Sequence, residues 1–267
     1  MKRLIILFLV FLIFTWCNKN KNPIYNSEKV NIYPGYPTTL YPLSESELNA
    51  LQAEFDSLNN NRICTYLDEY GLTRNGRYCR TFNNTKISQD SALDIAVNTV
   101  LRNSKFTNVK DRLLLIENGY TIRVNSSDSS KWEIRFNPQH YEGLEIPFSW
   151  INVIISGHEP YSITGHWYSN ILIPQHDNFN IEEAKQKILE EKIVWYGIDG
   201  KPRDYYISKN SILEPINKAI FPLREENLIE LRVTWKIPID FGGFTGWYIY
   251  FDSITGEIVF TEPLFVS

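Results

Sequence analysis

The sequence of 267 residues contains little cysteine, little methionine and no marked excess of charge. It has three cysteines, one methionine, and 27 basic against 31 acidic residues. A chain without a clustered basic face lacks the electrostatic footprint of a nucleic-acid-binding protein, so we expect no nucleic acid partner. The hydrophobic fraction of 43% is large enough for one sizeable core or two smaller ones.

Common catalytic motifs are also missing from the sequence. It has no His-Glu-x-x-His zinc motif, no Gly-x-Ser-x-Gly nucleophile turn, and no glycine-rich loop that leads into a helix and cradles phosphate. Its glycine-rich stretch, residues 241–246, comes before a predicted strand. We therefore expect no catalytic residues and no cofactor.

The N-terminus has the pattern of an export signal. Lys2 and Arg3 precede an apolar run over residues 4–14, which is too short to cross a bilayer. The run ends near Cys17, after which the chain turns polar. This arrangement resembles a bacterial lipoprotein signal peptide, although Trp16 stands where such signals carry a small residue. The resemblance implies a signal peptide at 1–16, lipidation of Cys17, and a lipid anchor on a membrane of the cell envelope; an ordinary or uncleaved signal is the alternative.

Export changes the interpretation of the two remaining cysteines. Cys64 and Cys79 lie on either side of turn sequences at 70–71 and 75–76. Cysteine pairs in an oxidising compartment usually form disulfides, so we predict a Cys64–Cys79 bridge. A loop of this length predicts a stabilisation of about 3 kcal/mol. The alternative, a metal bound by the two cysteines, lacks a nearby histidine.

Two further segments are predicted before the main body of the chain. Residues 17–43, rich in proline and asparagine, predict an extended tether. Residues 44–85 predict a helix followed by the disulfide-bearing hairpin. Ser44 and Glu47 form a capping-box pattern at the start of this helix. Apolar residues follow at helical spacing, at Leu48, Leu51, Phe55 and Leu58.

The rest of the chain repeats one order of elements, over residues 86–175 and again over 176–267. A capped helix begins each unit, after Ser88 in the first and Asn180 in the second. β-rich segments with alternating apolar residues follow, which is typical of antiparallel strands with one buried face. The prediction is an α+β fold of two units, each an antiparallel sheet with a helix packed on one face.

Tryptophans recur in both units, and their positions favour packing over binding. Four lie at matched places in the repeat and are predicted to be core residues: Trp132, Trp150, Trp235 and Trp247. Four other aromatic residues fall outside the repeat and are the better candidates for exposed contacts: Trp167, Trp195, Tyr205 and Tyr206.

The polar residues of the C-terminal hairpin are accounted for by its turn. Asp252 begins the turn, where its carboxylate can accept local N–H groups, Thr255 lies within the turn, and Gly256 suits the left-handed conformation that closes it. With the tryptophan-containing strand at 235–237, this hairpin resembles the end of a PepSY-type domain. The resemblance covers residues 179–265 and extends more weakly over 87–175.

PepSY-like domains imply a function without catalysis. The resemblance implies a protein-binding module that inhibits or regulates a peptidase of the envelope, so we expect another envelope protein as partner. Two alternatives stay open. One is a metal-dependent hydrolase of the envelope that uses His158, His166 and His176. The other is a lipoprotein that binds a small ligand, which would need a deep apolar pocket.

Overall fold

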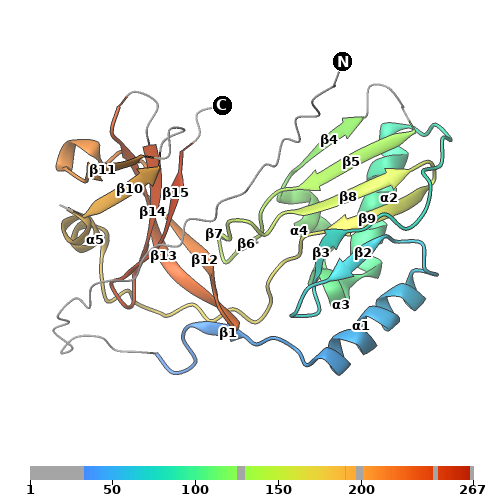
Figure 1. Cartoon of the computed structure of the whole chain (residues 1–267), viewed down its shortest axis with the longest axis horizontal. Helices are drawn as coiled ribbons and strands as arrows, with labels where there is room; N and C mark the ends of the chain where they lie inside the picture. Colours follow the sequence, from blue (N-terminus) through green and yellow to red (C-terminus); the bar gives the residue numbers. More distant parts are fainter. Residues whose placement is uncertain (1–32, 125–129, 190, 197–200, 243–245, 265–267) are drawn as a thin grey trace, which may run out of the picture.

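The structure is a computed structural model, and it describes residues 33–124, 130–189, 191–196, 201–242 and 246–264. The predicted signal peptide at 1–16 and the lipidation site Cys17 lie outside these residues. Two units lie side by side in Figure 1, the first on the right and the second on the left. Within the described residues, no helix has the length and apolar character needed to span a membrane.

The first unit is a four-stranded antiparallel sheet with helix α2 (Gln89–Arg102) packed on one face. Ser88 caps this helix, and its buried Ala92, Ala96 and Val100 share one core with the sheet. Short helices α3 (Ser104–Thr107) and α4 (Arg112–Glu117) follow α2. The sheet order is sequential, with strands β4 (Tyr120–Val124), β5 (Lys131–Phe136), β8 (Ile151–Ser156) and β9 (Glu159–Thr164).

The second unit repeats this arrangement. Helix α5 (Ile181–Ile188) has a capping box between Asn180 and Glu183, and it buries Ala184 and Ile188 against the sheet. Between helix and sheet come the hairpin β10 (Lys192–Tyr196)–β11 (Pro202–Tyr206) and a 3-10 turn, η1 (Lys209–Ser211). The sheet again runs in sequence order, through β12 (Asn217–Glu225), β13 (Leu228–Asp240), β14 (Gly246–Asp252) and β15 (Ile258–Pro263).

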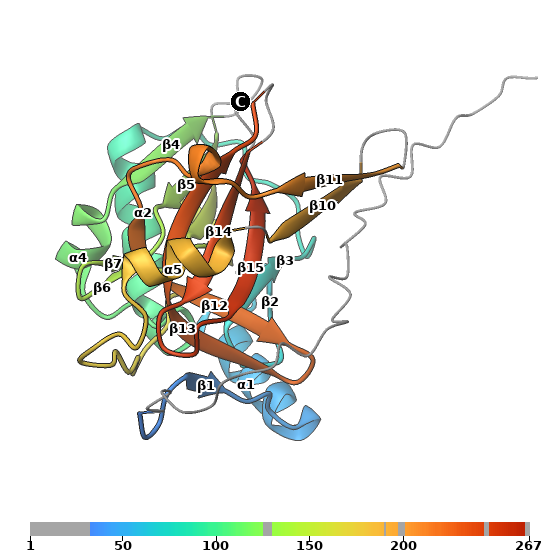
Figure 2. The ribbon, with the colours of Figure 1, turned by 90° about the vertical axis from the view of Figure 1, so that its left-hand side faces the viewer.

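Each unit is therefore a helix followed by a four-stranded meander. This confirms the prediction of an α+β fold with two units and a helix on one face of each sheet. Figure 2 shows α5 in front of the strands of the second unit. The two sheets are separate, but the first unit reaches the second through a hairpin between β5 and β8. Its strands are β6 (His140–Tyr141) and β7 (Leu144–Glu145), and β7 pairs in parallel with β12 at Glu145 and Ala219.

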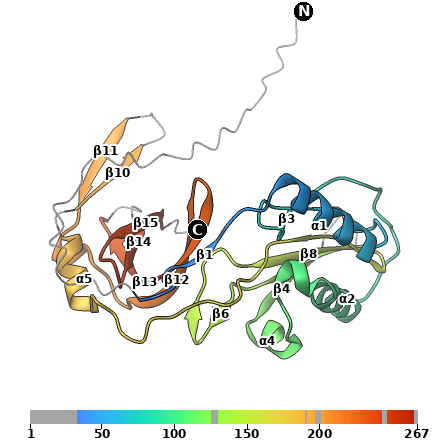
Figure 3. The same ribbon diagram turned by 90° about the horizontal axis from the view of Figure 1, so that it is seen from below.

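The N-terminal segment contacts both units. Strand β1 (Thr38–Leu40) pairs with β13 of the second unit, whereas α1 (Glu45–Leu58) lies in the first unit (Figure 3). Tyr36, only 6% exposed, packs against the second sheet. The prediction of a tether over 17–43 is therefore wrong for its described part, since this stretch pairs with a strand and buries an aromatic ring. The proline and asparagine content indicates an extended backbone, and an extended backbone can pair with an exposed strand as well as form a free tether.

Helix α1 and the hairpin after it follow the sequence pattern. Ser44 and Glu47 make the predicted capping box, and Phe55 is fully buried against Phe106 of the first core. Strands β2 (Thr65–Leu67) and β3 (Thr73–Gly76) form the hairpin. The exposure predicted for Trp167 is wrong, because the ring is only 3% exposed and belongs to the core of the first unit.

The predicted disulfide joins Cys64, which is fully buried, to Cys79, with 5.5 Å between their Cα atoms. The residues after it cross the end of the first sheet. There Arg80 pairs with Glu159, and Phe82 stacks on Tyr161 at 4.2 Å between ring centroids. The disulfide therefore ties the residues that follow Cys79 to β2 and, through β2, to β9.

Removing the bridge in a Cys64→Ala/Cys79→Ser double variant should lower the free energy of unfolding by about 3 kcal/mol, because the unfolded chain regains the entropy of a 15-residue loop. Urea unfolding monitored by tryptophan fluorescence measures the change. Wild-type protein in reductant is the matched control and should unfold like the variant. An unchanged midpoint after complete reduction would contradict a stabilising role for the bridge.

Candidate functional site

The second sheet has one covered face and one open face. Alternate residues of β13, including Ile237 and Ile239, point toward α5 and belong to the core beneath it. The residues between them point to the opposite side, which no helix of the described chain covers. On this open face, Phe221 of β12 lies 4.5 Å from Tyr250 of β14 and 4.9 Å from Phe260 of β15, measured between ring centroids.

A residue of the first unit completes this group of rings. Phe148, in the segment between β7 and β8, lies edge-on to Phe221 at 6.1 Å and to Phe260 at 6.5 Å. We call these four residues, Phe148, Phe221, Tyr250 and Phe260, the aromatic face. Two of its rings remain open to solvent: Phe148 is 50% exposed and Phe260 is 41% exposed.

Local hydrogen bonds hold Phe148 in an unusual backbone conformation. Its φ angle is 66°, a left-handed value that a bulky residue adopts only when its surroundings require it. The neighbouring Ser149 Oγ donates to the Ile146 carbonyl at 2.6 Å and accepts from the Gln139 N–H at 2.7 Å. Gln139 also donates to the Tyr168 carbonyl at 2.8 Å, which anchors the segment to the chain that joins the units.

The polar groups beside the aromatic face are paired with each other. Lys236 Nζ lies 4.5 Å from the centre of the Tyr248 ring and 3.7 Å from Glu145. The Tyr250 hydroxyl donates to Glu262 at 3.0 Å. Burial, followed by the charge of Glu262, raises the pKa of Tyr250 well above its ordinary value, so the ring stays neutral. The face therefore offers apolar contact area and no free catalytic base.

The predicted turn residues lie at one end of the same sheet. Asp252 Oδ1 accepts from the backbone N–H groups of Ile254 at 2.8 Å and Thr255 at 3.0 Å. Gly256 has a φ of +75°, and a Cβ added there would lie 2.6 Å from the Phe179 ring. Glycine is required at this position by both its backbone angle and its surroundings.

Asp252 has a second role that the sequence did not indicate. Its side chain is fully buried, and Oδ2 lies 2.9 Å from Arg232 Nη1 on the neighbouring strand. Oδ1 accepts from the Tyr36 hydroxyl at 3.2 Å, and that hydroxyl in turn accepts from the Val233 N–H at 2.9 Å. Burial, with the charge of Asp252 next, raises the pKa of Tyr36. One carboxylate thus joins the turn, the sheet and the N-terminal segment.

The three histidines of the metal hypothesis are not brought together. His158 is exposed in the turn between β8 and β9, and His176 is exposed in the chain that precedes α5. His166 lies against the β2–β3 hairpin, where its Nδ1 is 3.3 Å from the Thr73 carbonyl. Across the described ranges, no group of three or more histidine, cysteine or acidic side chains could hold a metal ion.

His166 belongs to a buried polar junction between the units. Its Nε2 and Asp68 Oδ2 are both buried without a hydrogen-bond partner among the described residues. Arg224, from the end of β12, approaches Asp68 at 4.0 Å. Burial lowers the pKa of His166, although the charge of Asp68 acts in the opposite direction. The junction keeps His166 neutral where the units meet.

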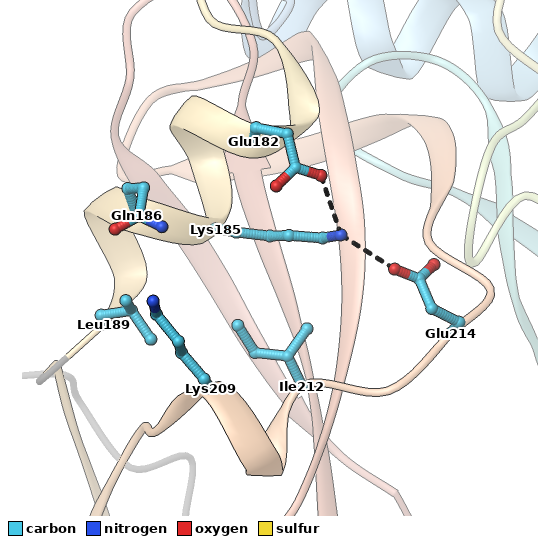
Figure 4. A pocket seen from close by; sticks show the side chains of 7 residues that line it. All are labelled: Glu182, Lys185, Gln186, Leu189, Lys209, Ile212 and Glu214. Carbon is cyan, nitrogen blue, oxygen red and sulfur yellow. Dashed lines mark hydrogen bonds and ion pairs between the residues drawn. The ribbon is translucent and has the colours of Figure 1, made fainter.

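The small-ligand hypothesis predicts a deep apolar pocket, and the hollow beside α5 in Figure 4 is charged instead. Its volume is about 280 Å³. Lys185 Nζ lies between Glu182 at 3.1 Å and Glu214 at 2.9 Å, so its charge is already compensated. The hydrogen bond to Glu214, followed by that to Glu182, raises the pKa of Lys185. This group fixes α5 to the chain after η1.

A larger hollow, of about 460 Å³, lies on the first unit. It combines apolar side chains with two cations and one carboxylate, and Lys131 Nζ sits 4.0 Å from the centre of the Phe82 ring. Its lining consists of Phe82, Arg123, Val124, Lys131, Trp132, Glu133 and Ile154.

Comparison with known proteins adds little to these observations. No family model matches the chain, and no curated protein matches it. Among solved structures, the Bacillus megaterium YpeB C-terminal domain is similar over 84% of this chain and 99% of that chain, with 15% sequence identity and a TM-score of 0.31. A likeness of this size carries no argument about the chain.

Replacing Asp252 by Asn should lower the free energy of unfolding by about 2 kcal/mol, because Arg232 loses a fully buried counter-charge and keeps Glu230 as its close carboxylate partner, while the turn keeps an oxygen acceptor. Urea unfolding measures the loss. Glu257→Gln is the matched control: Glu257 lies 3.7 Å from the same arginine but its side chain is 52% exposed, so its removal should cost less than about 1 kcal/mol. Equal losses in both variants would refute the central role of Asp252.

The stability of the protein should fall as the pH drops below about 6.5, the ordinary pKa of histidine. Below this pH His166 binds a proton in the unfolded chain, but it stays neutral in the folded chain because burial lowers its pKa there. His166→Gln should therefore flatten the dependence of unfolding free energy on pH between about 5 and 7. The exposed His158→Gln variant should keep the wild-type slope, and a wild-type slope in His166→Gln would contradict the assignment.

Proposed function

We propose that this chain is a non-catalytic binding module of the bacterial cell envelope. It is exported by the signal at 1–16, held to a membrane by a lipid on Cys17, and binds another envelope protein on the aromatic face of its second unit. The export signal and the lipid site come from the sequence pattern. The choice of binding surface is supported by the exposed rings of the second sheet.

The observation that carries the proposal is the half-exposed pair Phe148 and Phe260. Single exposed apolar residues are common on protein surfaces, but these two rings pack against the same buried ring, Phe221: Phe148 edge-on and Phe260 stacked. Aromatic side chains held in fixed positions lose little entropy on binding and are enriched at the centres of protein interfaces. The strained backbone of Phe148 favours such a role, since a ring needed only for folding could lie on an ordinary backbone.

The surroundings of the aromatic face favour binding over chemistry. Two charged groups beside the face, Lys236 and Glu262, are paired with Glu145 and with the Tyr250 hydroxyl. Paired groups at the rim of an apolar patch give specificity to a docking surface. The PepSY-like pattern of residues 179–265 supports a peptidase as the partner class, and inhibition or regulation of that peptidase as the outcome.

A photo-reactive phenylalanine analogue placed at position 260 tests the proposal in the native envelope. Irradiation should join the chain to one partner protein, because the ring at 260 lies at the centre of the proposed contact. The same analogue at Leu58, which is 43% exposed on α1 in the first unit, is the control and should give no such adduct. Protein gels and mass spectrometry identify the product.

A Phe148→Ser substitution then tests whether the face acts as one surface. It removes the contribution of the first unit and should reduce the yield of the adduct from position 260 by about tenfold, the effect of losing about 1.4 kcal/mol of binding. No adduct from position 260, or equal adducts from 260 and 58, would refute the proposal. If the partner is a peptidase, its activity with and without the purified chain decides between inhibition and passive binding.

A further inference from the structure

The outer strands of the two sheets are not equally protected. In the first sheet, the edge at β9 is covered by the β2–β3 hairpin, where Thr73 Oγ1 donates to the Gly165 carbonyl at 2.6 Å. In the second sheet, the edge at β12 is covered by β7. The other edges, β4 and β15, have no further strand beside them among the described residues. Uncovered edges are the places where sheets add strands from another chain.

Strand β15 contains a proline that hinders the addition of a further strand, and β4 has no such residue. The Leu264 N–H donates to the Gly246 carbonyl at 2.7 Å, so the ladder alternation points the backbone of residue 263 away from β14. That residue is Pro263, which has no N–H to offer a new strand. Strand β4 contains no proline and no lysine. It is therefore the less protected edge of the two.

The ladder also shows which groups of β4 face outward. The Asn137 N–H donates to the Gly119 carbonyl at 2.9 Å, which marks residues 119 and 137 as a hydrogen-bonded pair. Alternation along β4 then turns the backbone groups of Thr121 and Arg123 toward β5. The backbone N–H and C=O groups of residues 120, 122 and 124 point to the open side, where they can serve another strand.

Apolar side chains accompany this open backbone edge. On β4 itself, Tyr120 is 37% exposed and Val124 is 45% exposed. The preceding helix α4 exposes Leu113 by 68% and Leu114 by 45%. β4 lies at the margin of the first unit in Figure 1, with α4 leading into it. An edge strand with exposed apolar residues and without a protecting proline is suited to strand pairing.

We infer that this edge binds a second copy of the chain, through antiparallel pairing of β4 with β4 about a two-fold axis at Ile122. In this register, residues 120, 122 and 124 of one copy face 124, 122 and 120 of the other. All three outward residues then form hydrogen-bonded pairs, as an antiparallel ladder requires. Tyr120 of each copy lies opposite Val124 of its partner, an aromatic pair with a β-branched residue that stabilises sheets.

Charge selects this register over its neighbours. The axis at Ile122 sets Arg123 opposite Thr121, so no like charges face each other. Moving the axis by one residue toward the C-terminus would place Arg123 opposite Arg123, which is destabilising. Moving it the other way would leave Val124 without a partner within the strand. The sequence YTIRV is thus self-complementary in one register, as an interface between identical copies requires.

The light-scattering mass of the full chain in detergent, corrected for the detergent, tests the inference. Wild type should give about twice the chain mass of 31.3 kDa. Tyr120→Lys/Val124→Lys should give the single mass, because the proposed register sets lysine opposite lysine twice. Tyr120→Lys/Val124→Glu should restore the double mass, because the same register sets lysine opposite glutamate twice.

Val194→Lys is the control, since Val194 is 41% exposed on β10 and distant in sequence from the edge. It should leave the double mass unchanged. A single mass for wild type would overturn the inference, and so would a double mass for the lysine–lysine variant or a single mass for the lysine–glutamate variant. Circular dichroism of each variant establishes that the fold is intact. The result is independent of partner binding on the aromatic face, which is built on the second sheet and contains no residue of β4.

Discussion

The pairing of β7 with β12 is the contact on which the arrangement of the molecule depends. Two repeated units, each with its own core, have no intrinsic reason to keep a fixed relation. The hairpin β6–β7 leaves the first sheet and adds to the edge of the second, where Glu145 pairs with Ala219. It covers one sheet edge, and it carries Phe148 to the open face of the second sheet. This hairpin therefore covers the edge, completes the aromatic face and, together with the pairing of β1 with β13, connects the units.

The buried carboxylate of Asp252 secures the second unit from its other end. It joins Arg232 of β13, the turn before β15 and Tyr36 of the N-terminal segment. Taking a charge out of water is costly, and here the cost is offset by an arginine and several hydrogen bonds. The sheet that carries the aromatic face is thus braced by the first unit through β7 and by the N-terminal segment through Tyr36. Rigid support of this kind lowers the entropy lost when a surface binds a partner.

Local rules of the sequence predicted the parts of this structure that local physics determines. The capping residues Ser44 and Asn180 marked two helix starts, and the repeat of helix and strands gave the fold class. The disulfide was predicted from the cysteine count and the expected export of the chain. Partners distant in the sequence could not be predicted in this way. Nothing near Tyr36 indicates that it meets Asp252, and nothing near Phe148 indicates a ring on the opposite unit.

The candidate site could not be predicted from the sequence for the same reason. Phe221, Tyr250 and Phe260 were visible as strand residues with alternating polarity, a pattern that predicts one buried face without stating which face is covered. Only the position of α5 decides that these rings lie on the open side. Trp167 is the opposite case, a residue predicted to be exposed that is buried. It lies outside the repeat pattern, yet a turn of the connecting chain places it in the first core.

The proposed function requires that a partner covers the aromatic face in the envelope. The most direct measurement is hydroxyl-radical oxidation of the native Phe260 and Leu58 side chains, in envelope preparations and after purification, followed by mass spectrometry. Both side chains are exposed in the isolated chain, at 41% and 43%. Phe260 should be protected in the envelope and oxidised after purification, whereas Leu58 should be oxidised in both. Equal oxidation of Phe260 in the two preparations would contradict the proposal.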